Sequence, residues 1–389
     1  MNQLSLRTAV AAALLRLAAA QSMPDLTDLR NAPRPYSSVF QIEAGAIGSQ
    51  ARQTVPSIGA DDDVSWDAKV YFLDESVGSR RGALEAYAGR DGIFASYTDG
   101  KLVGDDTVTR LEFRARPWMF YRDGFYRDGD FVANGLYEGR DYEGYIGFGR
   151  EAQPGLYVEL GPYYRSLDFD RSDVTPPTFT VPDGYSAYGG RLYLEQSTVQ
   201  LDRRRGVPRD GFVLTAIGER EWNDSQGVFG ATGGGFSTEL PSAVWRVRGR
   251  LEWYIPASDS ATWEIFGYGG WQDEKDRVQN FEGQRPLGNI WGDGQLRLRL
   301  HLGQSITLTP FGQLQFSRVL EEDGTSSTKD FFFGGGVETY VHLGSAVSLH
   351  GWYSFLDNDS RPSIRIDEDV HGEHMFYLGM VLRFGSQRR

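Results

Sequence analysis

Apolar and polar residues alternate with a period of two along most of the chain. From residue 243 to residue 255, every second position is apolar or glycine. The positions between them include Arg246, Arg248, Arg250, Glu252 and Tyr254. The same alternation recurs over 261–271, 294–302 and 375–384. Because successive side chains of a β-strand point to opposite faces, this pattern predicts strands with one apolar face. After residue 20 no comparable helical stretch is found, so the pattern indicates an all-β protein.

Large aromatic residues stand near both ends of the apolar faces. They form pairs eight residues apart, namely Trp245 and Trp253, Trp263 and Trp271, and Phe376 and Phe384. At about 3.3 Å per residue and a tilt near 40°, eight residues span about 20 Å of height. That height is close to the apolar band between the two aromatic girdles of a membrane barrel. The spacing therefore favours a transmembrane barrel over a soluble sandwich, with these six residues as its aromatic girdle.

The alternating segments predict a single antiparallel barrel of about sixteen strands. The expected strands are 64–73, 82–90, 92–99, 107–117, 130–138, 142–150, 155–166, 184–197, 210–222, 243–255, 261–272, 293–302, 305–319, 330–342, 345–356 and 373–384. Short turns at 90–92, 151–155, 256–260, 303–304 and 343–345 alternate with longer loops at 167–183, 223–242, 273–291, 320–329 and 357–372. This asymmetry is typical of outer-membrane barrels, with short turns and both chain ends on the periplasmic side. The count is open by two, because 37–48 also has strand character and 121–129 contains two turn-like repeats.

The chain divides into four expected segments. Residues 1–20 combine Arg7, an apolar run and an Ala-x-Ala site, which predicts an export signal peptide, although an Ala-rich amphipathic helix is the alternative. Residues 21–63, with Pro24 and Pro33, are expected to form a periplasmic lead-in segment, 64–384 the barrel, and 385–389 a short tail.

Composition excludes some classes of site and partner but does not identify a function. The absence of cysteine excludes disulfides and thiolate metal sites, and a net charge of -13 argues against nucleic acid as a partner. The 48 glycines and the 13% of aromatic residues suit girdled strands and tight turns. Outer-membrane lipid and lipopolysaccharide are the expected partners, and the oligomeric state is left open.

One turn in the second half carries a family resemblance. Asp202 and Arg203 end one strand, and Pro208 and Gly211 open the next, where proline fixes φ and glycine lets the chain turn without a Cβ clash. This pattern, over about 185–384, resembles the barrel of the BamA and TamA-type outer-membrane assembly and two-partner-secretion transporter superfamily, the bacterial surface antigen barrel. The terminal aromatic Phe384 also resembles the signal that the barrel-assembly machinery reads during insertion.

The resemblance implies a sixteen-stranded barrel with a loop in its lumen and a weak seam between the first and last strands. By this comparison 273–291 is the lumen loop, with Arg285 and Gly288, and the seam joins 64–73 to 373–384. The loop lacks the Val-Arg-Gly-Phe/Tyr motif of the family. Residues 21–63 are also too few for one polypeptide-transport-associated (POTRA) domain, so the barrel is expected to lack these domains.

Arginines gather on the face that alternation turns inward. They are Arg246, Arg248, Arg250, Arg297 and Arg299, and Arg114, Arg116 and Arg383 lie on the same face. A ring of arginine would bias a water-filled channel toward anions. The alternative is that these arginines pair with inward Glu112, Glu159, Glu252 and Glu264 and fill the interior.

Candidate catalytic and metal-binding groups are few. His350 has Ser348 and Ser354 on its own face, which would suit a Ser-His lipid hydrolase, but that face points into the lumen, so a polar lumen residue is favoured. The acidic runs 61–63, 321–323 and 367–369 lack the spacing of a calcium loop. We therefore expect no catalytic residues, no metal and no cofactor.

The sequence predicts an integral outer-membrane barrel with a role in outer-membrane biogenesis or transport. The alternative is a passive porin-like channel for small solutes, which could include anions. A lipid-modifying outer-membrane enzyme is the least favoured class.

Overall fold

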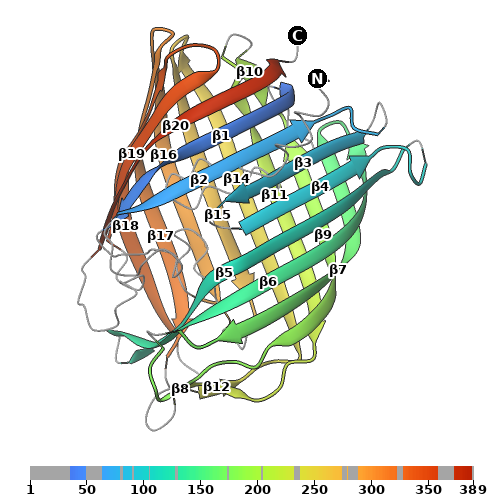
Figure 1. Ribbon diagram of the computed structural model, residues 1–389, viewed down its shortest axis with the longest axis vertical. Helices are drawn as coiled ribbons and strands as arrows, with labels where there is room; N and C mark the ends of the chain where they lie inside the picture. Colours follow the sequence, from blue (N-terminus) through green and yellow to red (C-terminus); the bar gives the residue numbers. More distant parts are fainter. Residues whose placement is uncertain are drawn as a thin grey trace, which may run out of the picture.

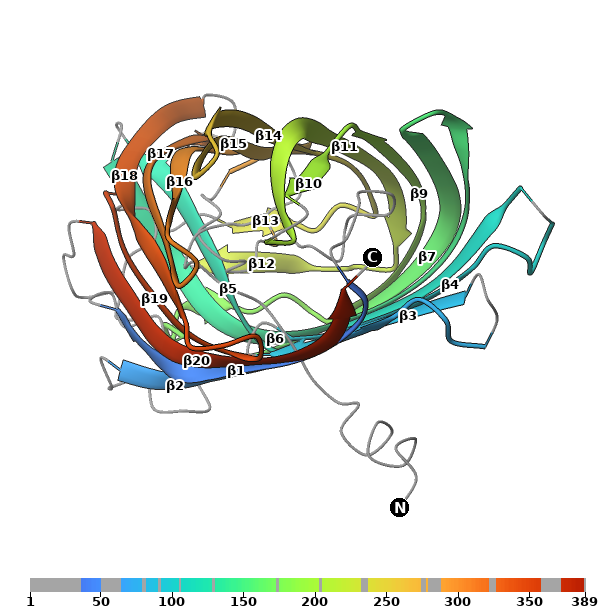
Figure 2. The ribbon, with the colours of Figure 1, turned by 90° about the horizontal axis from the view of Figure 1, so that it is seen from above.

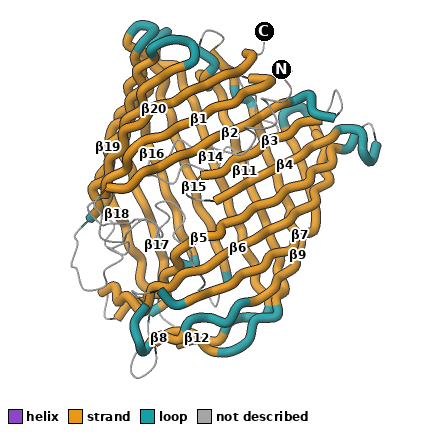
Figure 3. Tube along the Cα trace, viewed as in Figure 1, coloured by secondary structure: helices purple, strands orange, loops and turns teal. Residues whose placement is uncertain are grey.

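A computed structural model describes residues 36–387 of the chain, apart from 50–63, 79–81, 90–91, 105, 128–129, 173–174, 203–204, 232–236, 274–277, 279–287, 322–326 and 358–371. These residues form strands, turns and loops, and the described part contains no helix (Figure 3). No helix that is long and apolar enough to cross a membrane occurs among them. The signal peptide predicted for 1–20 lies outside the described residues.

The all-β fold with about sixteen strands is confirmed. The main sheet has seventeen strands, of which the short β10 pairs only with β11, so sixteen strands form the wall. Every strand of the wall is antiparallel to its neighbours, and β1 pairs with β20 to close the ring (Figures 1 and 2). The wall strands are β1 Tyr36–Ser49, β2 Val64–Asp74, β3 Gly82–Gly89, β4 Gly92–Asp99, β5 Val108–Arg127, β6 Asp130–Gln153, β7 Leu156–Asp170, β9 Tyr185–Ser197, β11 Val207–Asn223, β14 Ala243–Ser258, β15 Ala261–Gln272, β16 Ile290–Leu302, β17 Ile306–Leu320, β18 Ser327–His342, β19 Val347–Leu356 and β20 Glu373–Gln387.

The predicted strand count is right because two errors offset each other. The first wall strand is β1, which lies inside the predicted lead-in 21–63, so the barrel begins at Tyr36. The predicted strands 130–138 and 142–150 are one strand, β6, which pairs with a β5 that continues through the turn-like 121–127. The register shifts at Asp123/Gly124, where β6 has one extra residue, Asn134, and both Asp123 and Gly124 stay in the ladder. At the other end, β20 continues through Gln387 into the predicted tail.

Because β1 was left out and β6 was divided into two strands, one turn was predicted at the wrong end of the barrel. Tyr36 of β1 and Gln387 of β20 are paired at one end of the barrel, here called the terminal end, and the opposite end is called the loop end. The turn after β3 at 90–92 was predicted at the terminal end, but β3 runs away from that end, so this turn points toward the loop end. From β7 onward the predicted sides of the short turns agree with the structure.

A small second sheet covers the loop end. It consists of β8 Phe179–Thr180, β12 Val228–Ala231 and β13 Ser237–Glu239, and it crosses the outline of the barrel in the view along its length (Figure 2). It packs on inward aromatic residues of the wall, with Phe179 stacked on Tyr137 at 5.6 Å between ring centroids. The buried cluster comprises Tyr121, Tyr137, Leu167, Phe179, Tyr185, Ala187, Phe229 and Leu240. We call this sheet and its cluster the cap.

Candidate functional site: the charged interior and the barrel wall

The five arginines predicted to face the lumen all point inward. Only 3% to 28% of each side chain is exposed. Each forms an ion pair: Arg246 with Glu221, Arg248 with Glu219, Arg250 with Glu252, Arg297 with Glu264 and Glu338, and Arg299 with Glu264. The four glutamates proposed as partners from the sequence are all ion-paired, since Glu112 binds Arg114 and Glu159 binds Arg110. The interior is thus a paired network of charges.

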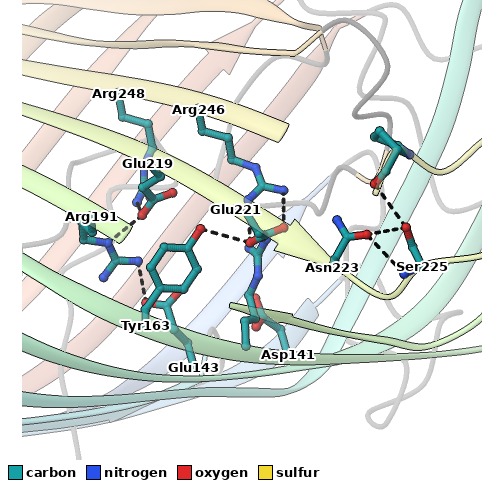
Figure 4. A network of polar contacts seen from close by, with 12 residues as sticks. Asp141, Glu143, Tyr163, Arg191, Glu219, Glu221, Asn223, Ser225, Arg246 and Arg248 are labelled. Atoms are coloured by element: carbon teal, nitrogen blue, oxygen red, sulfur yellow. Dashed lines mark hydrogen bonds and ion pairs between the residues drawn. The ribbon is translucent and has the colours of Figure 1, made fainter. Parts of the chain in front are cut away.

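Arg191 of β9 joins two carboxylates of this network (Figure 4). Its guanidinium donates to Glu219 at 2.6 Å and to Glu143 at 2.7 Å. It also lies over the rings of Tyr145 and Tyr163, at 4.9 and 5.0 Å from their centroids. Because a planar guanidinium has five donors, one arginine can join three strands of the wall in this way.

Glu221 of β11 forms a second node beside it (Figure 4). Its carboxylate is fully buried and accepts from Arg246 at 2.9 Å, from Tyr163 at 3.2 Å and from Arg165. A buried carboxylate is stable only when its oxygens are compensated in this way. The β11 carboxylates Glu219 and Glu221 therefore hold arginines from strands on both sides.

His350 is a polar residue of the interior, as the sequence favoured. It is fully buried, with Nδ1 at 2.7 Å from Glu43 and Nε2 at 3.3 Å from Glu338, and its ring stacks on Tyr340. Ser348 instead contacts Nδ1 of His342 at 2.9 Å. The Ser-His pair considered from the sequence is therefore not formed with Ser348. Among the residues that the structure describes, no group of three His, Asp or Glu side chains could hold a metal ion.

A cavity of about 80 Å³ remains within the charged interior. Six arginines and three acidic residues line it, together with aromatic and apolar side chains. The charged lining residues are Arg114, Arg116, Arg165, Arg191, Arg246, Arg248, Asp141, Glu143 and Glu219. This volume holds a few water molecules or one small polar group.

The turn that carries the family resemblance is compact. Gly211 has a φ of +88°, and a Cβ there would lie 2.3 Å from the carbonyl oxygen of Thr198, so glycine is required as predicted. Asp202 binds Arg205 at 2.8 Å, and the carbonyl of Pro208 accepts from the lumen arginine Arg299 at 2.8 Å. Arg203 lies outside the described residues.

Only part of the expected lumen loop 273–291 is described. Arg285 lies outside the described residues, and Gly288 packs at the start of β16, where a Cβ would lie 2.6 Å from the carbonyl oxygen of Arg318. Val278 packs against the cap and lines the interior cavity. At least this residue of the loop therefore lies within the barrel.

The six girdle residues lie on the outer face of the wall. Between 39% and 54% of each is exposed. Trp253, Trp263 and Phe384 lie toward the terminal end, whereas Trp245, Trp271 and Phe376 lie toward the loop end, as the strand registers require. Outward apolar side chains also occur on β5, β7, β16 and β18.

Among the described residues, the wall is incomplete between β2 and β5. The β3–β4 hairpin has only eight residues per strand and ends part-way across the wall (Figure 1). Pairing of β2 with β3 ends at Val70↔Ala88, and pairing of β4 with β5 ends at Ile93↔Ala115. Beyond these pairs, residues 64–69 of β2 and 116–127 of β5 have no described strand between them. We call this region the ladder break.

An outward-facing tryptophan at the ladder break is more exposed than the girdle residues elsewhere on the wall, as expected where no described strand lies beside it. Trp66 of β2 borders the ladder break and is 77% exposed, more than any of the girdle residues. On the inner face of the same segment, Asp67 and Lys69 form an ion pair at 2.8 Å and are buried. The edge of the break therefore has an apolar outside and a polar inside.

Two features were missed from the sequence. Glu219, Glu221 and Glu338 lie on the inward side of predicted strands, so alternation could have identified them as partners of the arginines. The ladder break had a weaker signal, because 92–99 was the shortest predicted strand and 82–90 was little longer. Their place in the wall depended on β1, which the prediction left out.

Comparison with known proteins identifies a fold. No family model and no curated protein matches the chain. CdiB from Acinetobacter baumannii superposes with a TM-score of 0.54 at 10% identity, covering 90% of this chain and 60% of CdiB. BamA from Haemophilus ducreyi lacking POTRA domains 1–3 gives a TM-score of 0.51 at 12% identity, covering 90% and 70%. The chain thus spans about three fifths of the length of that CdiB. The protein has a sixteen-stranded barrel similar to those of CdiB and BamA, and at these identities the likeness concerns the fold alone.

Proposed function

We propose that the protein is an integral outer-membrane barrel that passes or receives molecules sideways, between the bilayer and its interior, through the ladder break. This activity would serve outer-membrane transport or biogenesis, and we propose no catalytic step. The observation that carries the proposal is the short β3–β4 hairpin. It leaves β2 and β5 without an intervening strand in the described wall over the half of the barrel nearer the loop end.

Simple geometry gives the size of the opening. At the tip of the hairpin, β2 and β5 are separated by three interstrand spacings of about 4.8 Å, or about 14 Å. The β2 edge is six residues long, about 20 Å. An acyl chain or an extended peptide fits an opening of this size. With both chain ends in the periplasm, the opening would face the outer leaflet.

Membrane insertion is supported by the outer surface. The outward faces of the strands carry many exposed large apolar side chains, far beyond the patches that a soluble monomer exposes. In the proposed orientation the aromatic girdle would lie at the two bilayer interfaces. The cap and the paired arginines argue against the alternative of a passive diffusion pore, since they occupy the lumen that solute would need.

Cysteine substitution tests the lateral route directly, because the chain has no native cysteine. Ser65 and Ser317 are both inward-facing and buried, but Ser65 borders the ladder break, whereas Ser317 has strands paired on both sides. Ser65→Cys and Ser317→Cys would be reconstituted separately in liposomes and treated with pyrenyl maleimide, which dissolves in the bilayer. Glutathione in both aqueous compartments would remove reagent that arrives through water.

We expect Ser65→Cys to be labelled at least about tenfold faster than Ser317→Cys, because an open wall lowers the barrier to approach from the bilayer by about 1.4 kcal/mol or more. Heat-modifiable migration on gels would confirm that both variants are folded. Equal labelling rates in two folded variants would refute the lateral route.

A further inference from the structure

We propose that the arginine-lined cavity behind the ladder break binds the anionic headgroup of an amphiphile that enters from the bilayer. The inference rests on the proposed lateral route and names the class of molecule that uses it. The headgroup would lie among the arginines inside the barrel, while the hydrocarbon chain would extend through the ladder break into the outer leaflet.

The cavity lies directly behind the β5 edge of the break. Ala115 is the last β5 residue paired with β4, and Arg116, the next residue, lines the cavity. Tyr121, farther along β5 where it pairs with β6 but not with β4, also lines it. A molecule that passes the β5 edge would therefore meet the cavity first.

Charge favours an anion in this position. The cavity lining has six arginines and three carboxylates. Glu112 and Glu221 lie behind the lining and pair with Arg114 and Arg165, and even with both included, arginines exceed carboxylates. Because the cavity lies inside the barrel, where water screens charge less than at the surface, this excess favours a negatively charged group.

One arginine of the lining has an unused donor. The side chain of Arg165 binds Glu221 through Nη2, but its buried Nε–H has no hydrogen-bond partner among the described residues. An unsatisfied buried donor is costly, and a phosphate oxygen would satisfy it. Arginine also suits phosphate because its planar donors can engage two oxygens at once.

The rest of the lining suits the apolar part of the same molecule. Tyr121, Leu167 and Val278 line the cavity and also contribute to the cap cluster. The site thus changes from guanidinium groups to aromatic and aliphatic groups within a few residues of one strand. A phosphate attached to a hydrocarbon matches this change in polarity better than a free ion does.

Native mass spectrometry of the detergent-solubilised protein tests the assignment. The probes are phosphatidylglycerol, which is anionic, phosphatidylcholine, which has the same phosphate but no net charge, and inorganic phosphate. We expect phosphatidylglycerol to bind at least about tenfold more tightly than phosphatidylcholine, a difference of about 1.4 kcal/mol. Millimolar inorganic phosphate should not displace it.

Two double variants locate the binding. Arg116→Gln with Arg248→Gln removes two charges from the cavity and should abolish the preference for phosphatidylglycerol. Arg140→Gln with Arg209→Gln removes two charges from surface ion pairs with Asp170 and Asp259, and should keep the preference. Folding of both would be checked by heat-modifiable migration, and the comparison of lipids on the unaltered protein remains decisive if the cavity variant does not fold.

The possible failures are distinguishable. Equal binding of the two lipids would overturn the anionic assignment, and displacement by inorganic phosphate would show a site for free anions in its place. Loss of the preference in both double variants would mean that it depends on the total number of positive charges and not on the cavity, and would also overturn the proposal. Each of these results leaves the labelling of Ser65→Cys unaffected, so the lateral route would stand or fall on its own test.

Discussion

Two junctions of the wall differ sharply, the one that closes the ring and the one that the β3–β4 hairpin spans. β1 and β20 pair from Tyr36↔Gln387 to Ser49↔Met375, over thirteen residue pairs. β2 and β3 pair over five. Because the free energy of a sheet grows with its cross-strand pairs, the closing seam is the stronger junction. By this measure the β2–β3 junction is weaker than the seam at which the two chain ends meet.

Side chains inside the barrel reinforce the seam. Glu43 of β1 reaches across β20 to His350 of β19 at 2.7 Å. Arg383 of β20 donates to Gln41 of β1 at 2.6 Å. Between β2 and β3, the side chain of Tyr71 donates a hydrogen bond to Glu85 at 2.7 Å. The seam is thus fixed by both backbone and side chains.

The position of the weaker junction corrects one expectation taken from the family resemblance. A weak seam was expected between 64–73 and 373–384, but β1 lies between these two segments and pairs with both. Any lateral passage in this barrel would therefore use the ladder break, where the hairpin is too short to fill the wall. Strand length, as well as strand order, therefore determines which junction of such a barrel is the weakest.

The largest expected effect comes from forcing the seam apart. Gly45 of β1 faces β20 so closely that a Cβ would lie 2.4 Å from the carbonyl oxygen of Leu378 and 2.6 Å from Cα of Gly379. Gly45→Val would push backbone against backbone, and we expect it to cost about 3 kcal/mol or more of unfolding free energy. The measurement is the urea midpoint of tryptophan fluorescence in liposomes.

Gly218→Val is the control for this change. Gly218 lies in β11, and a Cβ there would have no atom within 4 Å. We expect its midpoint to change little, because valine suits a strand. If the two valine variants unfold at the same urea concentration, the seam is not the tightly packed junction described above.

A smaller loss is expected from cutting the side-chain link across the seam. Glu43→Ala leaves the fully buried His350 without its 2.7 Å partner, and we expect a cost of about 3 kcal/mol or slightly less. Glu85→Ala removes the corresponding link between β2 and β3 and should cost about 1 kcal/mol. The same urea titration would compare them, and a larger loss for Glu85→Ala would reverse the order of the two junctions.

Alternation predicted most strands of the wall. It could not predict that the β1–β20 seam is strong and the β2–β3 junction weak. Strands such as β14 and β20 have strict alternation and aromatic ends, so their faces were clear. β1 has the small residues Ala44, Gly45 and Ala46 at its centre, and small residues give a weak signal even where they allow the closest packing. Asp123 and Gly124 resemble a turn locally, but pairing with β6 keeps them in a strand.

The charged interior, too, could be predicted only in part from the sequence. Alternation placed the arginines on the inner face, but a partner across the barrel depends on register. Arg191 meets Glu143 and Glu219, which are 48 and 28 residues away in sequence. A pattern of a few neighbouring residues cannot indicate contacts between residues so far apart in the sequence. The residues of the interior could therefore be predicted, whereas its pairing and the remaining cavity required the structure.

The smallest expected effect is from a covalent lock on the seam. Ile42 of β1 and Leu382 of β20 are directly paired on the outer face, so their Cβ atoms should be close enough for a disulfide after substitution of both by cysteine. If lateral exchange uses the ladder break, the oxidised Ile42→Cys/Leu382→Cys protein should bind phosphatidylglycerol as the reduced protein does, within about twofold. If oxidation abolishes binding and reduction restores it, the amphiphile enters through the seam, and the stronger junction is the one that opens.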